Sequence, residues 1–213
     1  MSQQGGSQRQ TVEDALARRV EYGKGVTSGW AEALRELGMV DQAVYQAVAE
    51  TPTPELDGHF RRLSNAANYS RLWFGIAAVI AMLGGRRGRR VALEGVLAIA
   101  AASATVNLGI KPLFGRRRPE RAHPVSESRS VRTPESASFP SGHAASAFAF
   151  AYTVGRHLPG LAVPIRLLAG AVAYSRVHTG VHYPGDVVFG SIIGAGTAAT
   201  VAAASDRMSR THP

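Results

Sequence analysis

The chain has 213 residues and a mass of 22.5 kDa, which is enough for one domain or one compact membrane bundle and too short for two large domains. It contains no cysteine, which excludes disulfide bonds, thiol catalysis and cysteine-ligated zinc sites. The formal net charge of +9 predicts an anionic partner: a nucleic acid, an anionic lipid headgroup or a phosphorylated substrate.

Residues 1–65 form a polar N-terminal segment that begins with a Gln/Ser/Gly-rich tail, which we predict to be disordered. Apolar residues then recur at helical spacing in short stretches. These stretches run from Thr11 onward, from Trp30 to Gly38, from Asp41 to the Thr-Pro-Thr-Pro run at 51–54, and around Phe60. They predict short amphipathic helices on a membrane surface or packed on the rest of the protein, and surface helices of a soluble domain are the alternative.

From residue 66 to residue 205 the sequence is rich in Ala, Val, Leu, Ile and Gly, and a short tail, 206–213, follows. Five candidate membrane spans are Leu72–Gly85, Glu94–Ile110, Ala144–Leu158, Leu161–Tyr174 and Val187–Ala204. Because a span needs about 20 residues, only the second and the last reach that length without help. We predict an all-α integral membrane bundle of about five spans, with a soluble helical core as the alternative. In the last span, Gly190, Gly194 and Gly196 are expected to permit close helix packing.

Three polar motifs fall at the ends of these predicted spans. They are Lys111 to Arg118-Pro119, then Pro140-Ser141-Gly142-His143, then Ser175-Arg176 followed by His182 and Asp186. An antiparallel bundle would bring these ends to one face, at the membrane boundary. Their three cations could bind phosphate oxygens, and their two imidazoles could act as a nucleophile and a proton donor. The motifs therefore predict a phosphate pocket.

The spacing of the three motifs resembles the signature of the type 2 phosphatidic acid phosphatase family. In this sequence Arg-Pro follows Lys after six residues, Pro-Ser-Gly-His comes next, and Ser-Arg is followed by His after five residues and by Asp after three more. That family shares its catalytic core with the vanadium-dependent haloperoxidases. The resemblance covers residues 111–186 and agrees with a helical membrane core.

The resemblance implies a role for each matched residue. His182 would attack phosphorus to give a phosphohistidine, with Asp186 holding the other ring nitrogen. His143 would protonate the leaving oxygen and then activate water. The other matched residues would bind the phosphoryl oxygens: Lys111, Arg118, Ser141, Gly142 and Arg176. No metal or other cofactor is implied, because the three fixed cations would serve in place of magnesium.

Other polar residues near the motifs have simpler interpretations. Arg116, Arg117 and Arg121 fit a cytoplasmic cluster of positive charge as well as they fit the pocket. His178 is a candidate for a group behind the pocket, and His123 is expected to be an ordinary loop residue.

The predicted function is hydrolysis of a lipid phosphate or diphosphate at a membrane. A polyprenyl diphosphate or a polyprenyl-linked sugar phosphate ranks first, ahead of phosphatidic acid. The alternatives are a vanadate-dependent haloperoxidase-like enzyme and a non-catalytic basic membrane-binding protein. The expected partners are the lipid-linked substrate and membrane lipids. Nucleic acid is not expected, because the basic stretch 116–132 has no interleaved aromatic residue.

The Arg/Ala/Gly-rich composition resembles actinobacterial members of the family, so we expect a bacterial cell membrane. Four arginines between the first two spans predict a cytoplasmic loop, which places the catalytic face outside: Arg86, Arg87, Arg89 and Arg90. A long polar N-terminus without a signal sequence argues for the opposite orientation. We favour the external face.

Overall fold

The computed structural model describes residues 30–120 and 128–211, and every regular element in these two stretches is helical. The prediction of an all-α fold is therefore confirmed. The chain divides into two compact units, residues 1–51 and 52–213. The separate N-terminal segment that we expect to end at residue 65 stays a prediction.

The first unit contributes one described helix, α2 (Trp30–Glu50). It continues through Gly38 and Asp41, so the predicted interruption at Gly38 is wrong. A glycine inside a helix costs about 0.5–1 kcal/mol relative to alanine, which a helix of 21 residues tolerates. The helix expected from Thr11 lies outside the described residues.

The second unit carries the remaining helices in a single bundle. In chain order they are α3 (Pro54–Ala66), η1 (Asn68–Ser70), α4 (Arg71–Leu83), α5 (Gly85–Ala104), the π-helical turn η2 (Thr105–Ile110), η3 (Lys111–Leu113), α6 (Gly142–His157), α7 (Pro159–His178) and α8 (Pro184–Thr211). The predicted helical stripe around Phe60 is confirmed as α3.

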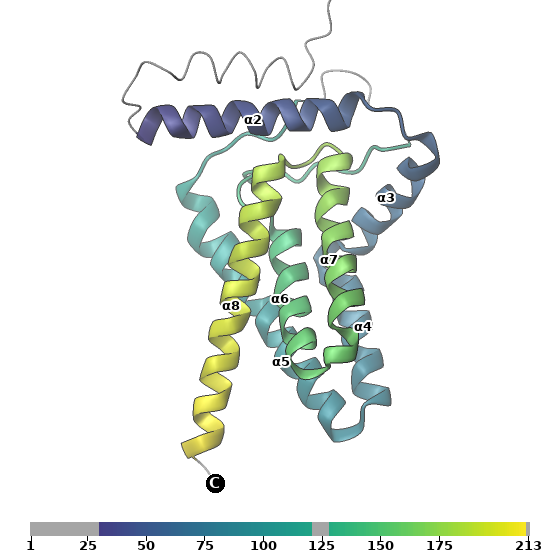
Figure 1. Ribbon diagram of the computed structural model, residues 1–213, viewed down its shortest axis with the longest axis vertical. Helices are drawn as coiled ribbons and strands as arrows, with labels where there is room; N and C mark the ends of the chain where they lie inside the picture. Colours follow the sequence, from purple (N-terminus) through teal and green to yellow (C-terminus); the bar gives the residue numbers. More distant parts are fainter. Residues whose placement is uncertain (1–29, 121–127, 212–213) are drawn as a thin grey trace, which may run out of the picture. The chain divides into compact units, whose positions relative to one another are not determined.

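Helix α6 is the centre of this bundle, and α5, α7 and α8 pack around it (Figure 1). Its small and apolar side chains are almost all buried, among them Ala147 and Phe150. Phe150 contacts Trp73 of α4, with ring centroids 5.5 Å apart. A second cluster of alanines joins α6 to α5 and α8.

Two glycines let α8 approach α6 closely. A Cβ on Gly190 would lie 2.5 Å from the Ser141 carbonyl oxygen, and one on Gly194 would lie 2.1 Å from that of Ala145. Close packing is therefore confirmed at these two positions. The expectation of close packing is wrong at Gly196, where a Cβ would meet nothing within 4 Å. The approach brings the start of α8 against the start of α6, where the Ser141 N–H donates to the Asp186 carbonyl at 2.9 Å.

Three helical segments in the described part of the chain are long and apolar enough to cross a membrane: Gly85–Leu113, Pro159–His178 and Pro184–Met208. A fourth is possible if Pro54–Ala66 and Asn68–Leu83, bent by 64°, form one broken span. Fewer segments pass this test of length and composition than the number of about five that we predict. Helix α6, at 16 residues, is only about 24 Å long and lies inside the bundle, and α4 alone has 13 residues.

The four arginines predicted in a loop lie instead in the first turns of α5. The chain turns tightly from α4 into α5, with a positive φ of 57° at Gly85. A Cβ on Gly88 would come within 2.2 Å of the Ile80 carbonyl oxygen, so only glycine fits this contact. The arginines therefore lie at the end of α5 that is opposite Lys111.

Candidate active site

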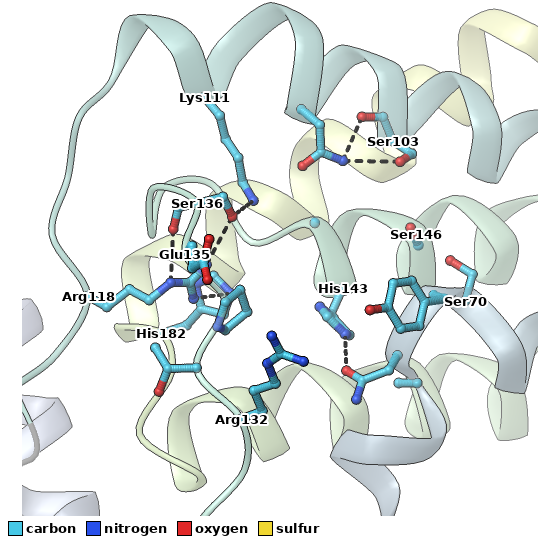
Figure 2. Close-up of a pocket in the computed structure, with 17 residues that line it drawn as sticks. Ser70, Ser103, Lys111, Arg118, Arg132, Glu135, Ser136, His143, Ser146 and His182 are labelled. Atoms are coloured by element: carbon cyan, nitrogen blue, oxygen red, sulfur yellow. Dashed lines mark hydrogen bonds between the residues drawn. The ribbon is translucent and has the colours of Figure 1, made fainter.

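A cavity of about 480 Å³ lies where the helix ends of the second unit meet. Lys111, Arg118, His143 and His182, which the motifs bring forward, line it together with Gly142 (Figure 2). The rest of its wall consists of residues 67–70, Ser103, Asn107, residues 132–136 and Ser146. The structure therefore gathers the cavity-facing parts of all three motifs in one place.

Lys111 and Arg118 share a contact with a serine that carried no motif signal. The Lys111 ammonium donates to Ser136 Oγ at 3.1 Å. The Arg118 guanidinium donates to the carbonyls of Ser136 at 3.0 Å and Val181 at 2.6 Å. Its Nη1 lies 3.4 Å from His182 Nε2. Both cations are thus fixed by neutral partners beside the predicted nucleophile.

Arg176 is buried near the end of α7 and is 1% exposed. Its Nη1 donates to Ser64 Oγ at 2.5 Å, and its Nε has no hydrogen-bond partner in the described residues. Its side chain does not line the cavity, but its charge lowers the pKa of both His143 and His182. Burying a cation without an anion is costly, so the arrangement favours an anion held between these groups.

His182 lies between a carboxylate and Arg118. Its Nδ1 is 3.4 Å from Asp186 Oδ2 and 3.4 Å from Ser138 Oγ, while Nε2 faces Arg118. The hydrogen-bond network assigns the proton to Nδ1, because the carboxylate accepts it. The lone pair is then on Nε2, which faces the cavity and can attack phosphorus.

The Asp186 carboxylate is fully buried and fixed by several donors. Ser138 Oγ donates to Oδ2 in a short hydrogen bond, and the Tyr183 N–H donates to the same oxygen at 2.9 Å. Arg116 forms an ion pair with Oδ1 at 2.9 Å. This ion pair connects Arg116 to the site, and its place in a cytoplasmic cluster stays a prediction.

The pKa of His182 is lowered to about 4. Burial is the largest cause, and the charges of Arg118 and Arg176 act in the same direction, while the hydrogen bond to Asp186 opposes them. Because the imidazole loses its proton above that pKa, it is neutral at physiological pH. A neutral ring is the form needed for attack on phosphorus.

His143 lies in the first turn of α6, which is not one of the candidate spans. Its Nε2 is 2.9 Å from Asn68 Oδ1, on the far side of the cavity from Arg118 (Figure 2). Burial, and then the positive charge of Arg176, hold the pKa of His143 well below its ordinary value. An anion bound among these cations would raise that pKa again and favour the proton-donating form.

Ser141 and Gly142 build the N-terminus of α6. The Ser141 hydroxyl accepts a hydrogen bond from the Ala144 N–H at 3.4 Å and caps the helix, and Ser141 does not line the cavity. Gly142 does line it. The positive end of the helix dipole is therefore close to the place where phosphate oxygens would bind. A direct contact from Ser141 to phosphate stays a prediction.

Sequence analysis did not single out several residues of this site. They are Asn68, Arg132, Glu135, Ser136 and Ser138. Ser136 and Ser138 lie in the Ser/Thr-rich stretch between the first two motifs, where no spacing distinguishes one hydroxyl from another. Asn68 precedes the first motif by more than 40 residues. Only the tertiary structure brings these side chains to the cavity.

His178 belongs to a buried cluster beside the site. Its Nε2 is 3.0 Å from Asp57 Oδ1, and Arg129 Nε donates to the same oxygen at 2.7 Å. The cluster joins α3, the segment after the first motif and the end of α7, and none of its three side chains lines the cavity. A role for His178 behind the pocket stays a prediction. His123 and Arg121 lie outside the described residues. In the described stretches, no group of three or more His, Asp or Glu side chains could hold a metal ion.

We expect Arg176→Lys to lower turnover by about 10²–10³-fold. A lysine has no planar fork with which to bind Ser64 and two phosphate oxygens together, and a buried ammonium loses its proton more readily than a guanidinium. Steady-state phosphate release measures the effect. Arg166→Lys, an exposed position on the same helix, is the matched control and should change turnover less than about twofold. Near-normal turnover of Arg176→Lys would remove Arg176 from the phosphate site.

The chain is similar in sequence to known phosphatases. A phosphatase from Mycobacterium tuberculosis, described as decaprenylphosphoryl-5-phosphoribose phosphatase, is 38% identical over 141 residues, which are 66% of this chain and 76% of that protein.

Two solved structures share the fold. The phosphatidylglycerolphosphate phosphatase of Bacillus subtilis, a transmembrane PAP2 type enzyme, has a TM-score of 0.63 and 20% identity, over 93% of this chain and 98% of its own. LpxE of Aquifex aeolicus has a TM-score of 0.61 and 23% identity, over 74% of this chain and 92% of its own.

The sequence profile of the PAP2 superfamily matches residues 92–209, which include all three motifs and helices α6 and α7 entire. This range is more than half of the chain. The predicted family is thereby confirmed, and with it the predicted class of enzyme, a phosphatase in a membrane-protein fold. The chain belongs to the PAP2 superfamily.

Proposed function

We propose that the protein removes the terminal phosphate of a polyprenyl-linked sugar phosphate through a phosphohistidine intermediate. One observation carries the proposal. Lys111, Arg118 and Arg176 lie near the two catalytic histidines, and none of the three forms an ion pair with a carboxylate within the described residues. Three cations held by neutral partners beside a neutral imidazole suit a phosphate dianion better than any other common ligand.

In the first step His182 Nε2 attacks phosphorus, and the bond from phosphorus to the sugar oxygen breaks. His143 gives a proton to that oxygen as it leaves. The ring of His182 becomes positively charged, and Asp186, itself held by Ser138 and Arg116, stabilises that charge. The three cations bind the phosphoryl oxygens throughout the transfer.

In the second step water replaces His182. His143, now neutral, takes a proton from water, and the water oxygen attacks phosphorus as the bond to Nε2 breaks. Inorganic phosphate leaves, and His182 returns to its neutral form. His143 regains its proton in this step, so the cycle closes without a metal ion or a cofactor.

The chemistry of the cavity supports a sugar headgroup. Beyond the motif cations, its wall presents Arg132, Glu135 and Ser103 (Figure 2), together with Thr133 and Asn107. These side chains can bind hydroxyl groups and a second anionic group. The name of the Mycobacterium tuberculosis relative describes such a molecule, with a sugar phosphate at one end and a prenyl-linked phosphoryl group at the other.

The membrane position of the site supports a lipid tail on the substrate. Lys111 and Arg176 lie near the last residues of two candidate spans, and Asp186 lies at the start of a third. A substrate could therefore keep its prenyl chain in the bilayer while its headgroup enters the cavity.

We propose that the protein lies in a bacterial cell membrane with this face outside. The arginines in the first turns of α5, at the opposite end of that span, support a cytoplasmic location for that end. Thiol labelling of single cysteines placed at Arg86 and at Glu120 would distinguish the two orientations in this cysteine-free chain. Gly88 is unsuitable for labelling because a Cβ there meets the Ile80 carbonyl.

Purified protein in detergent is expected to release inorganic phosphate from a polyprenyl-linked sugar phosphate in the presence of EDTA. It should act on that substrate with a higher kcat/KM than on a polyprenyl diphosphate or phosphatidic acid. Malachite-green detection of phosphate measures each rate, with His182→Ala as the blank. Complete loss of activity on chelation, restored by magnesium, would contradict the metal-free mechanism, and a preference for phosphatidic acid would contradict the substrate.

A further inference from the structure

Two polar residues of α3 and η1 reach the catalytic motifs from outside the matched range 92–209. Ser64 Oγ accepts a hydrogen bond from Arg176 Nη1 at 2.5 Å, and Asn68 Oδ1 lies 2.9 Å from His143 Nε2. The two residues are four positions apart. One short segment thus contacts both the buried cation and the predicted acid.

The backbone between α3 and α4 is bent in a way that brings Asn68 to the cavity. Tyr69 and Ser70 both adopt left-handed conformations, with φ of 54° and 59°. Such a conformation costs a residue other than glycine about 1–3 kcal/mol and is found mainly where the surrounding structure requires it. Without this turn, α3 would continue straight into α4. The bend of 64° instead leaves Asn68, Tyr69 and Ser70 in the cavity wall.

We infer that Ser64 and Asn68 are positioning residues: Ser64 orients the Arg176 guanidinium toward the phosphoryl group, and Asn68 holds His143 in its proton-donating form. The inference rests on the proposed function.

A contact with Asn65 shows which atom of the Asn68 amide faces His143. Its Nδ2 donates to Asn65 Oδ1 at 3.5 Å, so Oδ1 is the atom that faces His143. An amide oxygen can only accept, so His143 Nε2 must carry a hydrogen. In the described residues His143 Nδ1 has no hydrogen-bond partner. When the ring is protonated, Nδ1–H is then available to the leaving oxygen.

The contact with Asn68 and the other surroundings of His143 have opposite effects on the pKa of the ring. Burial and the positive charges of Arg176, His182, Lys111 and Arg118 all lower the pKa of the ring. The one carboxyl group in the cavity wall among the described residues is that of Glu135. Asn68 supplies the acceptor that contacts the ring and favours its protonated form. Removing Asn68 should lower the pKa of His143 further, and a carboxylate in its place should raise it.

Ser64 acts on binding rather than on proton transfer. It is fully buried, and its hydroxyl holds one Nη of Arg176 while Nε stays unpartnered. Without the hydroxyl, the guanidinium can rotate away from the phosphoryl oxygens. Ser64→Ala should therefore raise KM and weaken inhibition by inorganic phosphate by about tenfold, a loss typical of one charged hydrogen bond.

The deciding experiment compares kcat/KM against pH for wild type, Asn68→Ala and Asn68→Asp. The acid must be protonated, so activity falls as pH rises through the pKa of His143. We expect this alkaline limb to move to lower pH in Asn68→Ala and to higher pH in Asn68→Asp. Misplacing the acid should also lower kcat for a lipid substrate by up to about 10²-fold. His59→Ala, an exposed position on α3 whose ring contacts the Glu55 carbonyl, should leave the limb in place.

Failure of the inference and failure of the proposed function are distinguishable. If the wild type hydrolyses a lipid phosphate and the limb stays in place in both Asn68 variants, the inference is wrong and the proposed function stands. If the wild type releases no phosphate from any lipid phosphate, the proposed function fails. The pKa of His143, followed by NMR of the imidazole in the same three proteins, then tests Asn68 without turnover. Asn68→Asp conserves the size of the side chain, so a folding defect confined to Asn68→Ala leaves the test intact.

Discussion

His182→Ala is expected to abolish formation of a phosphoenzyme with every substrate, whatever its leaving group. Nε2 of His182 is the nucleophilic atom that the site holds beside Arg118 without a proton, because the ring proton lies on Nδ1 next to Asp186. Removing the nucleophile of a hydrolase lowers kcat by about 10⁶-fold, and we expect an effect of that order. The cations would still bind phosphate, so the affinity for inorganic phosphate should change little.

Rapid quenching with a substrate labelled in the terminal phosphate measures this effect directly. A phosphohistidine is labile in acid and stable in base, so wild type should show base-stable label that appears before free phosphate. His59→Ala, an exposed histidine on α3, is the control for histidine content and should behave as wild type. Acid-labile label on His182→Ala would overturn the assignment of the nucleophile.

The motifs and the fold class could be predicted from the sequence because both depend on spacing along the chain. Span ends that carry Lys111, His143 and Arg176 converge in any antiparallel bundle, whatever the details of its packing. The number of spans could not be predicted in this way. Helix α6 is as apolar as a membrane span, but at 16 residues it is short, and α5, α7 and α8 surround it.

Three side chains that hold the motif residues were beyond prediction for a different reason. Ser138 fixes Asp186, while Ser64 and Asn68 contact Arg176 and His143. Each is a common residue type in an unremarkable stretch, and each meets its partner across more than 40 positions of sequence. The close approach of α8 to α6 at Gly190 and Gly194 and the bend after α3 decide these contacts.

His143→Ala is expected to lower turnover of a lipid phosphate by about 10²–10⁴-fold, the usual contribution of general acid–base help. The size of the loss should depend on the leaving group. A sugar or prenyl oxygen leaves as a basic alkoxide and needs the proton, whereas p-nitrophenolate leaves readily without it. In the variant, p-nitrophenyl phosphate should still phosphorylate His182 and then stall, because His143 also activates the water of the second step.

The stalled intermediate is the decisive observation, because a merely unfolded or unbound variant cannot accumulate it. The same rapid-quench assay should show base-stable label persisting on His143→Ala when p-nitrophenyl phosphate is the substrate, and little label with the lipid. His157→Ala, at the other end of α6 and paired with Glu94, is the matched control. A defect of equal size across a series of leaving groups would show that His143 does not supply the proton. The cavity would then need another acid, and Glu135 is the remaining carboxyl group in its wall among the described residues.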